Sequence, residues 1–440
     1  MKSSENAKSL HSSFWSNLFF GERHDLRDLK QIVAASLKQH YRRLTLHINR
    51  EYANQPLLRD IDLTRILLGG EGSYDAVSWA ELTGDWRRGS TLLGNSIYVR
   101  FLKQYRDLGE KILDAENFEQ TDYFKNALRC VQFWGDYFGQ RTVEGIRAQA
   151  RAFVKLYERI KNGDLREVNF PSEKDHAHPG SRPVVRETLT RNTYQIIDGH
   201  HRLAVAWVLG HGKASVAILP SPIPSGLQSL VLKLAEERKE LQQPIGGPEF
   251  DDAWRVRRPC HGQFEMMIDF LTSKNYDLNR LSIVDLACSY GWFVNEFAKS
   301  GCDSIGVEAN PTALNIGRIA YDLRAEQLVQ GNFQTFLQKC DRVFDVVLLL
   351  GVLHDEALRG AAEALEQIFR RVDAITGSVL FFDIEQSSKR GGRNSLPQGD
   401  GESVTNLIKE NTSFTQALRL GCNSDDVGCD NCVLFACCRL

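Results

Sequence analysis

The sequence predicts an α/β protein with a helical amino-terminal region, a small α/β domain and a carboxy-terminal parallel sheet covered by helices. At 440 residues, the chain is about three times as long as a typical single domain, so two or three domains are expected. Its composition, 42% hydrophobic and 25% charged, is that of a globular protein. From residue 261 onward, short apolar runs alternate with helical patterns, which is typical of a parallel sheet with helices on both faces.

The first region, residues 1–160, is expected to form a helical domain. Four segments place apolar and charged residues at helical spacing: 25–43, 96–115, 123–138 and 144–160. The region is also rich in Trp, Tyr and Arg, as at Trp79, Arg88 and Tyr98. Two interpretations are open: an aromatic core with solvated arginines, or an arginine-lined pocket for an anionic ligand.

Residues 161–222 are expected to form the small α/β domain, and residues 223–260 a linker. The predicted strands of the small domain are 167–170, 183–186, 194–197 and 214–219, with one helix between the last two. Pro220, Pro222 and Pro224 then end the domain. In the linker, a charged helix is expected over 227–241, before a Pro- and Gly-containing break at 242–248.

Residues 261–440 are expected to form the carboxy-terminal α/β domain. A predicted helix at 264–271 precedes strands that alternate with helices. These strands are expected at 283–288, 304–308, 327–330, 343–350 and 378–384. No internal repeat is present.

Charge and hydropathy exclude several classes of protein. Lys and Arg number 54 and Asp and Glu 56, so the net charge is 54 − 56 = −2 and any nucleic-acid contact must be local. The longest apolar run, 343–353, contains Asp345 and is shorter than the roughly 20 residues of a membrane span. The first twenty residues lack the pattern of a secretory signal, and the ten cysteines are scattered. We therefore expect a cytoplasmic protein without a membrane span.

A candidate cofactor site follows the first strand of the carboxy-terminal domain. Residues 283–293, IVDLACSYGWF, read as a buried strand, a turn of small residues and the start of a helix. The next predicted strand ends about twenty residues later in Glu308, the spacing at which a carboxylate in a doubly wound sheet accepts hydrogen bonds from ribose hydroxyls. The sequence therefore predicts a nucleoside cofactor.

These residues resemble the class I S-adenosylmethionine-dependent methyltransferases, which have a Rossmann-like fold, and the resemblance covers residues 261–440. It implies that segments 414–420 and 432–439 form the antiparallel hairpin that closes the sheet. The first motif corresponds to Asp285, Ala287, Ser289 and Gly291, so only the last glycine is kept. Because Ala and Ser disfavour positive φ, the geometry of the loop is expected to differ in detail.

The resemblance also implies roles for the other site residues. Gly291 and its neighbours would hold the methionyl part of S-adenosylmethionine, and Glu308 the ribose. Asn332 and Phe333 would contact the edge and face of the adenine. Gly351, in the fourth motif at residues 349–354, would lie beside the methyl donor.

His354, at the end of that fourth motif, is the candidate catalytic residue of this domain. It is interpreted either as a general base for the acceptor or as a wall residue, since methyl transfer to a good nucleophile needs only in-line positioning. A dinucleotide-dependent dehydrogenase is the competing interpretation of this domain, but the sequence has no GxGxxG motif. A CxxC at Cys429 and Cys432 suggests zinc.

We expect no metal site, however. Cys437 and Cys438 are neighbours on a predicted strand and must point to opposite faces, so the cysteines of this region are interpreted as structural.

A second candidate site is the segment 196–206, IIDGHHRLAVA, in the small domain. It predicts a strand, a tight turn at Asp198 and Gly199, and a helix that begins with two histidines and Arg202. A helix amino terminus beside a guanidinium is suited to phosphate. The alternative is that Asp198 caps the helix and both histidines pack.

This segment resembles the ParB and sulfiredoxin-like domains over residues 163–220. The resemblance implies nucleotide-phosphate binding by Gly199, His201 and Arg202. In kinase-like members it implies catalytic roles for Asp198 and His200, with ATP or another nucleotide as ligand.

The sequence thus favours an S-adenosylmethionine-dependent methyltransferase that acts on an oxygen or nitrogen of a small-molecule or saccharide-like acceptor. The second domain would bind a nucleotide or phosphate and would then be either a binding module or a kinase. One alternative is a ParB-like nucleic-acid-binding protein whose methyltransferase domain modifies or senses its partner. Another is a methyltransferase fold that has lost catalysis, as the two missing glycines would allow.

Overall fold

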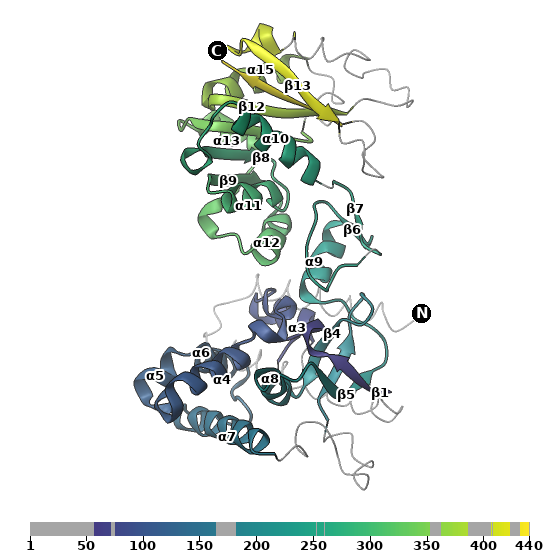
Figure 1. Cartoon of the computed structure of the whole chain (residues 1–440), viewed down its shortest axis with the longest axis vertical. Helices are drawn as coiled ribbons and strands as arrows, with labels where there is room; N and C mark the ends of the chain where they lie inside the picture. The colour runs from purple at the N-terminus through teal and green to yellow at the C-terminus, as the bar shows by residue number, and fades with distance from the viewer. Residues whose placement is uncertain are drawn as a thin grey trace, which may run out of the picture.

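The computed structural model describes residues 57–71, 75–163, 182–251, 253–258, 260–352, 362–385, 406, 408–422 and 432–439. Figure 1 shows two lobes joined by a short connector that carries α9, β6 and β7. The amino-terminal lobe contains a mixed sheet covered by helices. The carboxy-terminal lobe contains a larger sheet with helices on both sides.

The amino-terminal lobe is built on a five-stranded sheet with the order β1-β5-β3-β4-β2. Its strands are β1 (Leu57–Asp62), β2 (Ile66–Leu67), β3 (Val184–Glu187), β4 (Tyr194–Asp198) and β5 (Lys213–Leu219). The last three agree with the sequence prediction within a residue or two. The first two were not expected, because their region was predicted to be helical. β1 pairs antiparallel with β5, which lies far along the chain, so the local sequence does not indicate that β1 is a strand.

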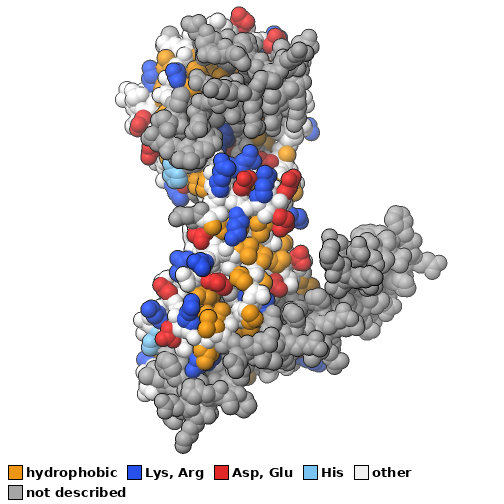
Figure 2. All heavy atoms as spheres, turned by 90° about the vertical axis from the view of Figure 1, so that its right-hand side faces the viewer, with side chains coloured by type: hydrophobic (Ala, Val, Ile, Leu, Met, Phe, Trp, Pro, Cys, Tyr) orange, Lys and Arg blue, Asp and Glu red, His pale blue; other side chains and the backbone are white. Residues whose placement is uncertain are grey.

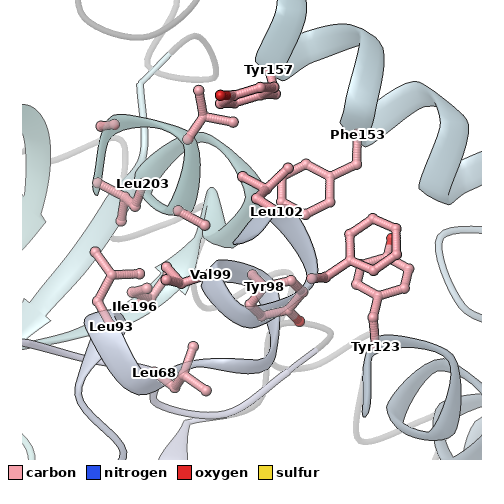
Figure 3. Packing of buried hydrophobic residues seen from close by; sticks show 14 of the residues in the cluster. Leu68, Leu93, Tyr98, Val99, Leu102, Tyr123, Phe153, Tyr157, Ile196 and Leu203 are labelled. Carbon is pink, nitrogen blue, oxygen red and sulfur yellow. The ribbon is translucent and has the colours of Figure 1, made fainter. Parts of the chain in front are cut away.

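Helices cover this sheet and share its core. They are α3 (Ala76–Thr83), α4 (Ile97–Leu108), α5 (Ala115–Gln120), α6 (Asp122–Trp134), α7 (Val143–Lys161) and α8 (His200–Val208). One cluster of buried side chains includes Tyr98 and Leu102 of α4, Phe153 of α7, Ile196 of β4 and Leu203 of α8 (Figure 3). The core therefore crosses the boundary that the sequence placed at residue 160.

The connector is packed against both lobes. It contains α9 (Gly226–Leu234) and a two-stranded parallel sheet of β6 (Glu240–Leu241) and β7 (Arg255–Val256). The helix is shorter than predicted and is followed by Glu236 and Glu237 at positive φ. Leu230 and Ile245 of the connector share a hydrophobic cluster with Ile316 of the carboxy-terminal lobe. The segment that the sequence predicts as a linker is thus packed into a hydrophobic cluster that it shares with the carboxy-terminal lobe.

The carboxy-terminal lobe has a seven-stranded sheet with the order β10-β9-β8-β11-β12-β14-β13. The strands are β8 (Ser282–Leu286), β9 (Asp303–Glu308), β10 (Leu328–Gln330), β11 (Phe344–Leu349), β12 (Thr376–Glu385), β13 (Gln416–Cys422) and β14 (Cys432–Cys438). The first five are parallel, and β14 pairs antiparallel with both β12 and β13. The expected parallel sheet with a closing antiparallel hairpin is confirmed.

Helices lie on both faces of this sheet, as Figure 1 shows. They are α10 (His261–Ser273), α11 (Trp292–Lys299), α12 (Pro311–Ala320), α13 (Phe333–Lys339) and α15 (Ala362–Ile375). Each face has its own hydrophobic cluster. Cys437 belongs to one cluster and Cys438 to the other, which confirms that their side chains point to opposite faces.

The exposed charges of the connector are of both signs. Figure 2 shows Lys and Arg side chains intermixed with Asp and Glu on the face that carries it. By sequence, the exposed cations Arg255 and Arg257 lie in the same segment as the exposed anions Glu236 and Glu237. In the part of the chain that the structure describes, no helix is both long and apolar enough to cross a membrane.

Candidate functional site

The candidate cofactor site lies where the parallel strands of the carboxy-terminal sheet end. In register, Asp285 of β8 faces Leu348 of β11, and Leu286 faces Val307 of β9. Residues just beyond these pairs therefore meet at one edge of the sheet. This edge brings together Asp285, the loop 287–291, Glu308 and Gly351, all of which the sequence predicted to be site residues.

The loop after β8 has left-handed backbone at alternate residues. The φ angles are 59° at Ala287, 53° at Ser289 and 81° at Gly291. The expectation that Ala and Ser would avoid positive φ is therefore wrong. A left-handed conformation costs a residue other than glycine roughly 1–2 kcal/mol, so contacts around the loop must hold it in place.

Two glycines outside the predicted motif make room for this loop. A Cβ atom on Gly306 of β9 would lie 2.5 Å from the Cys288 sulfur, and one on Gly317 of α12 would lie 2.0 Å from the Tyr290 carbonyl oxygen. Both distances are too short for a side chain. Sequence reasoning did not single out these glycines, although Gly306 lies inside a strand and Gly317 inside a helix, two settings that disfavour glycine.

Glu308 is fixed against the loop by two backbone groups. Its Oε2 atom accepts a hydrogen bond from the Ser289 N–H (3.0 Å), and its Oε1 atom accepts one from the Asn310 N–H (2.8 Å). The side chain is only half-buried, so its carboxylate remains accessible at the end of β9. An accessible, oriented carboxylate is what recognition of ribose hydroxyls requires.

Asp285 and Gln263 contribute buried acceptor atoms without a partner. Both side chains are 2% exposed, and no group among the described residues donates to Asp285 Oδ2 or Gln263 Oε1. Burial raises the pKa of Asp285 to about 8; Arg258 opposes this shift, whereas Glu308 and Asp383 add to it. A buried acceptor without a donor costs free energy, so a donor from a ligand or from a water molecule would stabilise this edge of the sheet.

Asp383 and Arg258 form an ion pair beside these acceptors. The Asp383 side chain is fully buried on β12, and its Oδ2 atom accepts from Arg258 Nη2 (2.9 Å) and Gln263 Nε2 (3.0 Å). Its Oδ1 atom accepts from the Gly351 N–H (2.5 Å). Gly351 has φ 70°, and a Cβ atom there would lie 2.3 Å from the Arg258 guanidinium.

Sequence reasoning missed Arg258, Gln263 and Asp383. An acidic residue inside the apolar run LFFDI was a usable signal for Asp383. Arg258 and Gln263 gave none, because their importance depends on a strand more than a hundred residues away.

The remaining predicted cofactor residues, Asn332 and Phe333, follow strand β10 at the start of α13. Asn332 is exposed, and its side chain caps α13 by accepting from the N–H groups of Gln334 (2.8 Å) and Thr335 (3.3 Å). Phe333 is half-buried and packs on the core of that face. Because Gln330 pairs with Glu308, both residues lie close to the end of β9. The candidate general base His354 lies outside the described residues.

The structure divides the predicted residues of the middle-domain turn into two groups. Asp198, Gly199 and Arg202 lie together at the surface: the Arg202 Nη2 atom is 3.4 Å from Asp198 Oδ2, and Gly199 opens α8 with φ 92° and no side-chain cap. A Cβ atom on Gly199 would lie 2.8 Å from Pro183. His200 instead points into the core, where its Nε2 atom is 3.0 Å from the Leu68 carbonyl oxygen.

His201 also packs inward, among aromatic side chains. Its ring centroid lies 4.2 Å from that of Phe153 and 5.2 Å from that of Phe138, and its Nε2 atom is 3.2 Å from the Tyr123 hydroxyl. Burial lowers the pKa of His201 to about 3. The His201 ring is therefore neutral at physiological pH. It lies on the side of α8 that faces α6 and α7.

A buried polar cluster, missed by sequence reasoning, supports this part of the fold. Arg88 pairs with Glu71, and Tyr98 donates a hydrogen bond to the same carboxylate. Burial raises the pKa of Glu71, but the Arg88 guanidinium, His200 and the hydrogen bond from Tyr98 together outweigh it, so the pKa of Glu71 is lowered. Arg88 also lies 5.0 Å over the Trp79 ring. For these residues the aromatic-core interpretation is correct, although the arginine is paired and not solvated.

Comparison with known protein families gives a match within the carboxy-terminal lobe. Residues 284–375 match the family model described as a methyltransferase domain. A sequence comparison finds no match among curated proteins.

Three solved structures are similar to part of this chain, at low sequence identity. The bifunctional kinase-methyltransferase WbdD is 16% identical, with a TM-score of 0.38 over 48% of this chain and 46% of that chain. Magnesium protoporphyrin IX methyltransferase (ChlM) from Synechocystis PCC 6803 with bound SAM is 12% identical, with a TM-score of 0.31 over 41% and 79%. The N-methyltransferase NodS from Bradyrhizobium japonicum WM9 is 14% identical, with a TM-score of 0.29 over 41% and 98%. The chain thus spans less than half the length of WbdD. Within the carboxy-terminal lobe, residues 284–375 thus match a methyltransferase domain, and they lie in the seven-stranded sheet described above.

Proposed function

We propose that the chain is an S-adenosylmethionine-dependent methyltransferase. The observation that carries this proposal is the pair of buried, unpartnered acceptors at Asp285 and Gln263, next to the oriented carboxylate of Glu308. A ligand with an ammonium group at one end and a ribose at the other meets both requirements. When bound, S-adenosylmethionine supplies an electrophilic methyl group.

The residues of this chain would hold such a ligand along the edge of the sheet. Asp285 and Gln263 would accept hydrogen bonds from the ammonium group, and the Arg258 guanidinium lies beside them. Glu308 would accept from the ribose hydroxyls, while Asn332 and Phe333 would border the adenine. Among the described groups that act on Asp285, the carboxylates of Glu308 and Asp383 outnumber the one guanidinium, that of Arg258, so the local charge balance favours a positively charged ligand.

Calorimetric titration with S-adenosylhomocysteine tests this assignment. Glu308→Gln keeps the size of the side chain and removes the charge, so we expect affinity to fall about ten- to a hundredfold, the effect of weakening charge-assisted hydrogen bonds. Glu326→Gln, at a residue paired on the surface with Arg324, is the matched control and should bind as the wild type does. No binding to the wild type, or equal binding by both variants, would contradict the proposal.

For the acceptor we propose an oxygen or nitrogen of a small-molecule or saccharide-like compound. Supporting this, the formal net charge is −2 and the exposed charges of the connector are of both signs. The rival function, modification or sensing of a nucleic acid, predicts transfer of labelled methyl from S-adenosylmethionine to DNA or RNA. A panel that contains amines, sugars and nucleic acids therefore distinguishes the two. Binding without any transfer would favour a domain that has lost catalysis.

We further propose that the turn at Asp198 to Arg202 binds the phosphate of a nucleotide. Gly199 starts α8 without a side-chain cap, so backbone N–H groups of the first turn remain for an anion next to Arg202. ATP should raise the melting temperature of the wild type but not of Arg202→Ala, and both should be stabilised by S-adenosylhomocysteine. Equal shifts by ATP in both proteins would refute this site. Labelled ATP distinguishes a kinase, which consumes it, from a binding module.

A further inference from the structure

A buried side chain of the connector, Gln243, is hydrogen-bonded to the cofactor loop. This residue is 3% exposed, and its amide makes one hydrogen bond to each end of the loop. The Nε2 atom donates to the Cys288 carbonyl oxygen (3.2 Å), and the Oε1 atom accepts from the Trp292 N–H (3.2 Å). Trp292 is the first residue of α11, so Gln243 bridges the start of the loop and the start of the helix that follows it.

Neighbouring residues fix the position of Gln243 from both sides. The backbone N–H of Gln242 donates to the Tyr290 hydroxyl (3.3 Å), and the Tyr321 hydroxyl donates to the Pro244 carbonyl oxygen (2.7 Å). Ile245 packs in one hydrophobic cluster with Tyr290. The segment 242–245 is therefore attached to the methyltransferase domain by contacts that do not involve the Gln243 amide.

The loop needs an external support of this kind. Ala287 and Ser289 occupy left-handed positions that glycine adopts without strain, so the isolated loop would favour other conformations. A primary amide is the side-chain group that satisfies both ends, because it offers a donor and an acceptor together. A carboxylate accepts but does not donate, and an alanine does neither.

We propose that Gln243 is a positioning residue of the cofactor loop, which holds Ala287 and Ser289 in the conformation that glycines adopt without support. Cofactor affinity then depends on a residue of the connector, outside residues 284–375 that match the family. This inference rests on the proposed function for its affinity readout only. The conformation of the loop is a property of the free protein and is measured without a ligand.

The affinity test uses Gln243→Ala with Gln242→Ala as its matched control. Gln242 contacts Tyr290 through its backbone N–H, so its replacement preserves that hydrogen bond. We expect Gln243→Ala to weaken S-adenosylhomocysteine binding at least tenfold, and Gln242→Ala to change it less than twofold. Adding Ala287→Gly and Ser289→Gly to Gln243→Ala should restore most of the affinity, because glycines hold the left-handed conformation unaided.

A ligand-free measurement separates this inference from the proposed function. Hydrogen exchange of the segment 287–292 in the free protein should be about tenfold faster in Gln243→Ala than in the wild type or Gln242→Ala. Unchanged exchange would overturn the inference, and so would a failure of the two glycines to restore affinity. If the wild type binds no S-adenosylhomocysteine, the proposed function fails, whereas faster exchange in Gln243→Ala still supports the positioning role.

Discussion

Replacement of Arg258 by methionine tests the ion pair under the cofactor site. Arg258 is 24% exposed and donates to the fully buried Asp383 (2.9 Å) and to the Leu350 carbonyl oxygen (3.2 Å). Methionine keeps most of the apolar stem and removes the charge. Asp383 would then be left as a buried carboxylate supported by the amide of Gln263 and the N–H of Gly351.

The expected loss of unfolding free energy follows from the burial of Arg258 and Asp383. Removing one partner of a buried ion pair costs about 3–5 kcal/mol, because the remaining buried charge has no opposite charge beside it. Partial exposure of Arg258 lets water reach the site, so we expect the variant to lose about 2–4 kcal/mol of unfolding free energy. An exposed pair, Arg370 with Glu366 (3.7 Å), provides the comparison, and Arg370→Ala should cost less than about 0.5 kcal/mol.

Urea unfolding of the full chain, followed by circular dichroism, measures these differences. Asp383→Asn provides the second arm, because a neutral amide removes the stranded charge. Arg258→Met should cost at least about 1 kcal/mol less in the Asp383→Asn background than in the wild type. A loss below about 1 kcal/mol for Arg258→Met alone, or strictly additive effects of the two substitutions, would refute this account of the ion pair.

The other predictions concern protonation and catalysis. Burial raises the folded-state pKa of Asp285 to about 8 from 3.8, so between about pH 4 and pH 8 the native state binds more protons than the unfolded state. Its contribution to stability is therefore lost as pH rises through this window, by up to about 1.4 kcal/mol per pH unit. Asp285→Asn should remove that slope, and parallel curves of melting temperature against pH for both proteins would contradict it. If His354 is a general base, His354→Ala should lower the methyl-transfer rate roughly a hundredfold with cofactor affinity nearly unchanged; wild-type turnover would make it a wall residue.

The parts of the fold that could be predicted are those with local signals. The strands β8 and β11 are mostly apolar and β9 has an apolar centre, as buried parallel strands require, and their ends place Asp285 and Glu308 at one edge. β1 was missed because its sequence, LLRDID, has no strand pattern and its partner β5 is far along the chain.

The parts of the site that could not be predicted depend on contacts between distant segments. Gln243 lies in a stretch that reads as a Pro- and Gly-rich linker, and only the fold brings its amide to Cys288 and Trp292. The packing of His200 and His201 was one of two alternatives from the sequence, which did not show their partners Tyr98 and Phe153, because these belong to a region predicted to be a separate domain. Local sequence identifies strand ends, whereas packing decides which side chains point into a site.

A crystal structure of the full chain soaked with S-adenosylhomocysteine tests the cofactor assignment. We expect ligand density along the loop 287–291, with the ribose hydroxyls on Glu308 and the ammonium group within hydrogen-bond distance of Asp285 or Gln263. Density at another site, or a loop that binds the ligand without contact to Glu308, would contradict the assignment of this domain's cofactor.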